Sequence, residues 1–207
     1  MPGGGGKTVS TLTALDEMAL VENDVWQVLI LSGLRVARSV WPFEPREWAH
    51  LAHLTVSTIT GTPEARKAAL MKRAHIYSMN DENLVWLVDL LGADWPFKTV
   101  VYDEATRAKG FRLRQGSTRA RALGSVAHTK VNRFIELTGT PAPNGLKDLW
   151  GQMWFLDQGE RLGRTHSSFE DRWFKKGWDG FSLEPLPHAE REIHARLKDI
   201  CLPIEPS

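Results

Sequence analysis

The chain has 207 residues, of which 42% are hydrophobic and 25% charged, a composition ordinary for one folded globular domain. Its formal net charge is +1, so a nucleic-acid-binding surface must be a local patch rather than a property of the whole chain. The single cysteine, Cys201, excludes an internal disulfide framework and fits a reducing compartment. No apolar run reaches the roughly 20 residues that span a bilayer, and the first residues lack a secretory pattern. We therefore expect a cytoplasmic protein with no membrane contact.

Short apolar segments alternate with helical patterns along the first two thirds of the chain. The predicted strands cover residues 25–32, 54–59, 75–79, 98–102 and 133–138. The predicted helices cover residues 10–21, 35–51 (interrupted by Pro42 and Pro45), 63–73, 81–91 and 117–130. Continuously apolar strands that alternate with helices favour an α/β fold, with a parallel sheet covered on both faces. Such a sheet has the carboxyl ends of all its strands at one edge, where open α/β sheets bind ligands.

The pattern changes after residue 140 to helices and loops, with a glycine-rich aromatic stretch at 173–181. Nine tryptophans is a high number for this length. Several stand in Trp-Pro or Trp-x-x-Phe contexts, and we expect them to pack the core rather than to stack on bases.

A run of glycines precedes Lys7 and Thr8 at the start of the first predicted helix. The candidate phosphate-binding glycines are Gly4, Gly5 and Gly6. Glycines let the backbone fold tightly around phosphates, so that its N–H groups and the helix N-terminus face them. Lys7 would then contact the β- and γ-phosphates, and Thr8 would be a ligand of Mg²⁺. The strand that usually feeds such a loop is missing, so a glycine run without function is the alternative.

A second candidate motif is the pair Asp103-Glu104, which follows the apolar strand 98–102. Two carboxylates at a strand end would lie at the ligand-binding edge of the sheet. Asp103 would hold Mg²⁺, and Glu104 would orient and deprotonate an attacking water. The alternative is a solvated turn.

The third motif, Thr138-Gly139-Thr140-Pro141, ends the last predicted strand. In this order, the three motifs resemble those of the first ATP-binding lobe of Swi/Snf-like superfamily-two helicases and translocases. The segments 143–150 and 156–163 are similar to phage and bacterial members in particular. The resemblance implies a RecA-like P-loop NTPase lobe at residues 1–165, followed by a helical extension at 166–207. It also implies that Thr138, Gly139 and Thr140 couple the nucleotide state to movement between two lobes.

Contacts with nucleic acid are implied by the same resemblance. Segment 31–37 is similar to a motif whose basic residue touches the nucleic-acid strand, here Arg35, although Ser32-Gly33 replaces the usual Ala-Pro. A basic run after the Asp-Glu pair would neutralise DNA phosphates, with Arg112 and Arg114 as the principal candidates. The run contains Arg107, Lys109, Arg112, Arg114, Arg119 and Arg121. A solvated charged face is the alternative.

The resemblance implies a DNA-dependent ATPase that uses ATP and Mg²⁺ and acts on double-stranded DNA, in a bacterium or a phage-infected cell. Ala105-Thr106 departs from the family's usual residues, and the sequence contains neither the adenine-reading segment nor the second lobe. We therefore expect slow hydrolysis by the chain alone, and a second lobe or complementing chain as partner. One alternative is an inactive or regulatory nucleic-acid-binding remnant of such a motor. Another is an unrelated P-loop kinase or GTPase, against which the motif at 138–141 argues.

Overall fold

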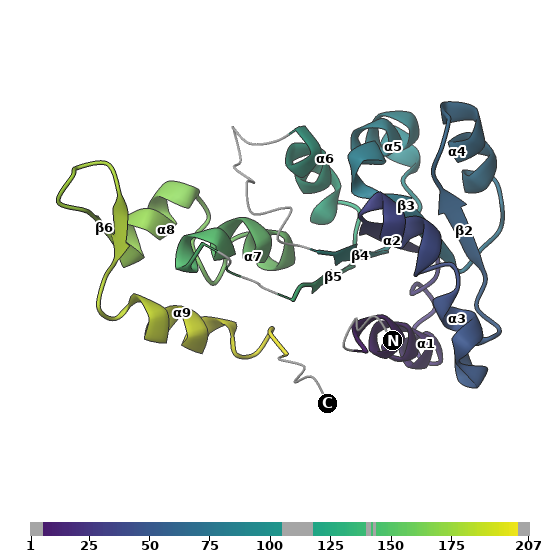
Figure 1. Cartoon of the computed structure of the whole chain (residues 1–207), viewed down its shortest axis with the longest axis horizontal. Coiled ribbons are helices and arrows are strands. Elements are labelled where there is room, and N and C mark those ends of the chain that lie inside the picture. Colours follow the sequence, from purple (N-terminus) through teal and green to yellow (C-terminus); the bar gives the residue numbers. More distant parts are fainter. Residues whose placement is uncertain (1–5, 105–117, 140–141, 143, 203–207) are drawn as a thin grey trace.

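A computed structural model describes residues 6–104, 118–139, 142 and 144–202 of the chain. Within these residues, five parallel strands form one sheet in the order β2-β3-β1-β4-β5 (Figure 1). The strands are β1 (Val28–Ser32), β2 (Val56–Ile59), β3 (Ile76–Asn80), β4 (Thr99–Asp103) and β5 (Arg133–Leu137). Each overlaps a strand predicted from the sequence, so the predicted parallel α/β sheet is confirmed.

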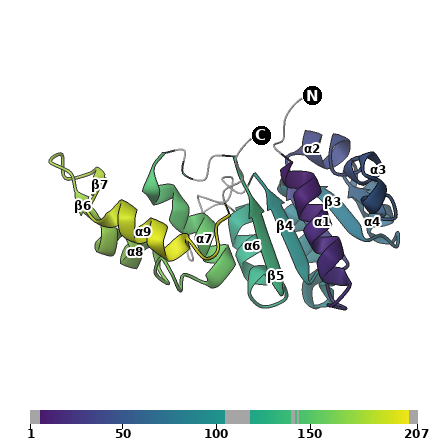
Figure 2. The same ribbon diagram turned by 90° about the horizontal axis from the view of Figure 1, so that it is seen from below.

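Helices cover both faces of the sheet. The α-helices are α1 (Lys7–Ala19), α2 (Leu34–Ser39), α3 (Glu44–Glu47), α4 (Pro63–Leu70), α5 (Leu84–Leu91), α6 (Thr118–Ala127), α7 (Leu149–Asp157), α8 (His166–Trp173) and α9 (Ala189–Leu197). Short 3₁₀ helices are η1 (Ala49–Leu51), η2 (Asp81–Asn83), η3 (Gly92–Asp94) and η5 (Leu146–Asp148). α1 and the α2–α3 segment pack on one face, whereas α4, α5 and α6 pack on the other (Figures 1 and 2).

The central strand β1 shows why the strands are apolar without alternation. Val28 and Ile30 join the hydrophobic cluster that contains Leu12 of α1. Leu29 and Leu31 join the cluster on the opposite face. All of them are fully buried. Because both faces of this strand are covered by helices, neither face needs polar residues.

The helical pattern predicted at 35–51 is broken as its prolines indicate. α2 ends at Ser39, and the next helix, α3, has Pro45 in its first turn. Proline fits a first turn because its missing N–H would have no partner there. The resulting turn carries Trp41 into the core, where it has no exposed surface.

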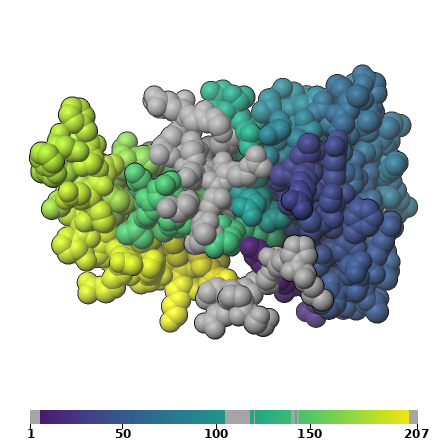
Figure 3. Space-filling view, viewed as in Figure 1, coloured from purple at the N-terminus to yellow at the C-terminus, as the bar shows by residue number. Residues whose placement is uncertain are grey.

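The C-terminal part lies beside β5 and projects from the sheet, as the green to yellow region of Figure 3 shows. α7 packs against β5, where the rings of Phe134 and Phe155 stack with centroids 5.8 Å apart. Further out, α8 and α9 accompany an antiparallel pair, β6 (Phe174–Lys176) and β7 (Leu183–Pro185). The sequence predicts loops here and misses this hairpin, because strands of three residues carry no readable alternation. None of the helices in the described residues has the length and apolar character of a membrane span.

The order of the strands places a topological switch between β1 and β4. From β1 the chain passes to β2 and β3 on one side, and then returns past β1 to β4 and β5. The helices that follow β1 and β4, α2 and α6, lie on opposite faces of the sheet. In open α/β sheets the crevice at such a switch point, beyond the carboxyl ends of the strands, is where ligands bind.

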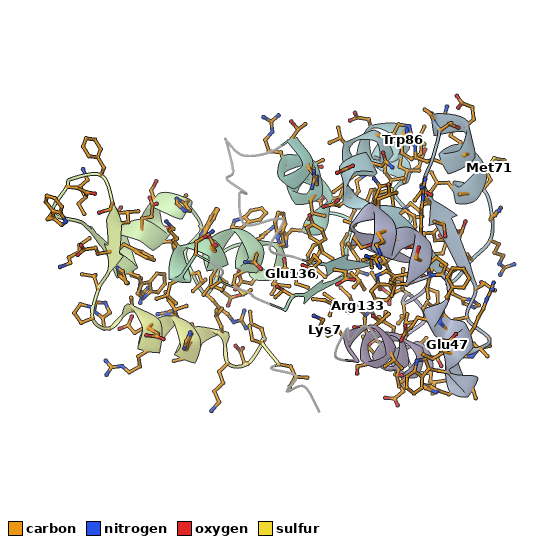
Figure 4. The ribbon with its side chains drawn as sticks, viewed as in Figure 1. Lys7, Glu47, Met71, Trp86, Arg133 and Glu136 are labelled. Carbon is orange, nitrogen blue, oxygen red and sulfur yellow. The ribbon has the colours of Figure 1, made fainter. Side chains whose placement is uncertain are left out.

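Glu136 of β5 has a buried carboxylate. It lies on the same face of the strand as Phe134, the face that α7 covers (Figure 4). Both carboxylate oxygens are buried, and neither has a hydrogen-bond partner among the described residues. Burial raises the pKa of Glu136 well above its ordinary value of 4.5. The folded state therefore holds this proton more tightly than the unfolded state does.

Glu136→Gln should make the chain more stable at pH 8. The folded-state pKa of Glu136 exceeds the unfolded one, so the free energy of unfolding of the parent falls as pH rises from about 4.5 toward the folded pKa. The substitution should recover about 1.4 kcal/mol for each pKa unit of the shift. Urea unfolding at several pH values measures the difference, which should vanish below about pH 4.5. Glu47→Gln, at an exposed position of α3, is the control; identical profiles for both variants would contradict the burial argument.

Candidate functional site

The start of α1 lies at the edge of the sheet where β4 and β5 end (Figure 2). Gly6 caps the helix with a φ of 71°, in the left-handed region that glycine adopts without strain. No side chain of the described residues caps this first turn. The backbone N–H groups around Lys7 and Thr8 are thus arranged as in a helix end that receives an anion.

Lys7, labelled in Figure 4, lies near a residue that comes from a distant part of the sequence. A Cβ atom added to Gly139 would stand 3.7 Å from Nζ of Lys7. Burial raises the pKa of Asp103, and the positive charge of Lys7 opposes this rise. The structure therefore brings a helix start, the end of β4 and the turn after β5 to one place.

Asp103 is the last residue of β4, and its side chain is half-buried. The indole Nε1 of Trp41 donates a hydrogen bond to its Oδ2 at 3.1 Å. Burial is the largest influence on the pKa of Asp103 and raises it. The hydrogen bond from Trp41 and the charge of Lys7 oppose this rise, whereas the charge of Glu104 adds to it. A bound cation would favour the charged carboxylate again. A carboxylate here and the Thr8 hydroxyl are oxygen ligands of the kind that Mg²⁺ takes, so the donor set fits this ion.

Glu104 follows β4 in a left-handed conformation, with a φ of 64°. Residues other than glycine rarely adopt this conformation, and those that do are often found at functional sites. The side chain of Glu104 is exposed. Asp103 pairs with Leu137 in the parallel sheet, so Glu104 and Thr138 follow the ends of adjacent strands. The second carboxylate and the third motif therefore follow neighbouring strand ends.

Five of the predicted site residues lie outside the described residues: Gly4, Gly5, Arg112, Arg114 and Thr140. Arg35 is exposed in the first turn of α2, just past the carboxyl end of β1. It thus stands at the same edge of the sheet as the Lys7 site.

Two hollows in the described surface lie away from this edge. One, of about 590 Å³, follows β2 and includes Arg46 and Lys72. The other, of about 570 Å³, includes Trp26 and His75 near the start of β3. Neither is lined by a predicted site residue. The candidate site is thus a convergence of side chains rather than a large cavity.

A buried ion pair at the same edge is not predicted by the sequence. Nη1 of Arg119 donates to Oδ2 of Asp81 at 2.8 Å, and the Tyr102 hydroxyl donates to the same oxygen at 3.0 Å. Asp81 directly follows β3 and is buried. The sequence groups Arg119 with cations that face DNA, whereas the structure gives it a protein partner. The sequence could not indicate that Arg119, rather than another cation of the basic run, pairs with Asp81, because the two residues are 38 positions apart.

Comparison with known proteins identifies the family of the chain. The model of the SNF2-related domain matches residues 3–204. Protein p41 of Acyrthosiphon pisum secondary endosymbiont phage 1 is 49% identical, over 98% of this chain and 45% of that protein. Helicase SWR1 of Candida glabrata is 29% identical over 88% of this chain and 12% of the helicase. Nuclear protein STH1/NPS1 of Saccharomyces cerevisiae is 25% identical over 83% of this chain and 12% of that protein. The chain thus spans less than half the length of these relatives. Since the family model covers nearly all of it, the chain belongs to the SNF2-related domain family.

Proposed function

We propose that this chain is the first ATP-binding lobe of an SNF2-type, DNA-dependent ATPase that moves along double-stranded DNA. The convergence of Lys7, Asp103 and Gly139 at the carboxyl edge of the sheet carries the proposal. Membership of the SNF2-related family supports it, as does the description of the relative SWR1 as a helicase. In this proposal residues 1–165 form the lobe, and residues 166–207 lead toward a second lobe.

Each site residue has a role that its position can support. Lys7 would neutralise the β- and γ-phosphates of ATP beside the first turn of α1. Thr8 and Asp103 would hold Mg²⁺, which when bound neutralises charge on the transferred phosphoryl group. Glu104 would orient the attacking water and accept its proton.

The third motif would link this chemistry to movement. Gly139 lies near Lys7, so a change at the phosphates would be felt at Gly139 and its neighbours in the third motif. A second lobe would read this change and supply an arginine finger, which contributes about 10³–10⁵ in rate in related reactions. Hydrolysis by the chain alone should therefore be slow.

The proposed nucleic-acid contact involves Arg35 at the same edge, together with Arg112 and Arg114. Such contacts would bind the phosphate backbone without regard to sequence and would weaken with salt. Similarity to the phage protein p41 favours a phage or prophage setting, in the cytoplasm of the host cell.

Lys7→Ala should weaken binding of a fluorescent ATP analogue by roughly 10- to 100-fold in the presence of Mg²⁺. The substitution removes a charged donor to the phosphates; such bonds are worth about 1.5–3 kcal/mol, and about 1.4 kcal/mol is a factor of ten. An equilibrium titration of the chain by fluorescence measures the affinity.

Lys67→Ala is the matched control, because Lys67 is an exposed lysine on α4, the helix beside the far edge strand β2. It should bind the analogue like the parent. Equal affinities for the parent and Lys7→Ala would contradict the proposed site. A parent chain that binds double-stranded DNA but no ATP would instead support an inactive or regulatory remnant.

A further inference from the structure

A buried tryptophan contacts the carboxylate at the centre of the candidate site. Nε1 of Trp41 donates to Oδ2 of Asp103 at 3.1 Å, across 62 positions of the sequence. Trp41 has no exposed surface. A buried indole N–H needs an acceptor, and a hydrogen bond to a carboxylate is stronger than one between neutral groups.

The surroundings of Trp41 fix the direction of its N–H. α2 ends at Ser39, and the backbone N–H of Trp41 still donates to the carbonyl oxygen of Val36 at 3.3 Å. The indole ring belongs to the hydrophobic cluster that also contains Leu12 of α1 and Val101 of β4. A ring packed at interior density has little freedom to change its rotamer. The donor is therefore a rigid one.

The contact restricts the Asp103 carboxylate in turn. Asp103 is the last residue of β4, and its side chain is partly exposed. With Oδ2 engaged by Trp41, rotation of the carboxylate would break a hydrogen bond. Groups that hold a ligand carboxylate in one orientation typically contribute 10- to 100-fold to metal affinity. The ring also belongs to the same hydrophobic cluster as Leu12 of α1, the helix that begins with Lys7.

We propose that Trp41 is a positioning residue, whose indole N–H holds the Asp103 carboxylate in the orientation that binds Mg²⁺ together with ATP. This inference rests on the proposed nucleotide-binding function of the site. It differs from a packing role, because the hydrogen bond can be removed while the shape of the ring is kept.

The test replaces Trp41 site-specifically with β-(3-benzothienyl)alanine, which has a sulfur atom in place of the N–H. The Mg²⁺ concentration for half-maximal binding of a fluorescent ATP analogue should rise roughly tenfold. The affinity at saturating Mg²⁺ and the thermal midpoint should stay close to those of the parent. Trp41→Phe should shift the Mg²⁺ dependence in the same direction but also lower the thermal midpoint, because it leaves a cavity.

Trp95 provides the matched control, since its buried Nε1 donates to the carbonyl oxygen of Phe97 at 2.9 Å. The same replacement there should leave the Mg²⁺ dependence unchanged; an equal shift would overturn the inference. Asp103→Asn separates the two proposals. If it does not change the Mg²⁺ dependence, the proposed function of the site is wrong. If it does and the Trp41 replacement does not, only the positioning role is wrong.

Discussion

Glu104→Gln should lower ATP turnover by about 10²–10⁴-fold, the usual contribution of a general base, and should leave ATP binding nearly unchanged. The amide keeps the size of the side chain but cannot accept the proton of the attacking water. The substitution also keeps the backbone conformation, because glutamine and glutamate meet the same penalty at a φ of 64°. Phosphate release measures turnover, with the chain combined with a complementing second lobe and saturating double-stranded DNA.

Glu82→Gln is the control for this experiment. Glu82 is an exposed carboxylate in η2, directly beyond β3 at the same edge of the sheet. It should turn over ATP at the parental rate, because no role at the phosphates is proposed for it. An equal loss of ATP turnover in both variants would show that the negative charge at this edge of the sheet matters, and not a general base at Glu104. A loss of ATP binding in Glu104→Gln as large as that in Lys7→Ala would also contradict the assigned role, since a base is not required for binding.

The sheet could be predicted from the sequence because its strands are short, continuously apolar and separated by helical patterns. The segment Val28–Ser32 is buried at every position, and only a strand covered on both faces needs such a run. The hairpin of β6 and β7 could not be predicted in this way. It is held by a turn in which Asp179 accepts hydrogen bonds from the N–H groups of Phe181 and Ser182, at 2.9 and 2.8 Å. A turn of this kind has no apolar periodicity.

The tryptophans show what residue type alone can and cannot predict. Trp41, Trp150 and Trp173 are fully buried, as expected for core residues, whereas Trp178 at the hairpin is 97% exposed. The sequence also places Asp103 and Lys7 at one edge, because each belongs to a motif with a known position relative to a strand or helix. It does not show that Trp41 reaches Asp103, since no local spacing relates two residues that meet only when α2 packs on the sheet.

The partners of Asp81 could not be predicted from the sequence either, because they come from distant elements. Substitution of Asp81 should have a large effect on stability. Its carboxylate is almost fully buried, with 1% of the side chain exposed, and it joins three elements: the end of β3, Tyr102 of β4 and Arg119 of α6. The Arg119 side chain is itself only 31% exposed. A buried ion pair adds little net stability compared with apolar residues of the same volume, but removal of one partner leaves a desolvated charge behind.

Asp81→Ala should lower the free energy of unfolding by about 3–5 kcal/mol, because it leaves Arg119 without the carboxylate it pairs with. Asp81→Asn should cost less, about 1–3 kcal/mol, since the amide oxygen can still accept from Tyr102 and Arg119 while the charge is lost. Urea unfolding measures both. Asp199→Ala is the contrast: Asp199 pairs with Arg161 at 2.6 Å, but its side chain is 65% exposed, so water and salt already screen the pair and only a small change is expected. Equal losses in Asp81→Ala and Asp199→Ala would show that burial of the Asp81 pair does not determine its contribution.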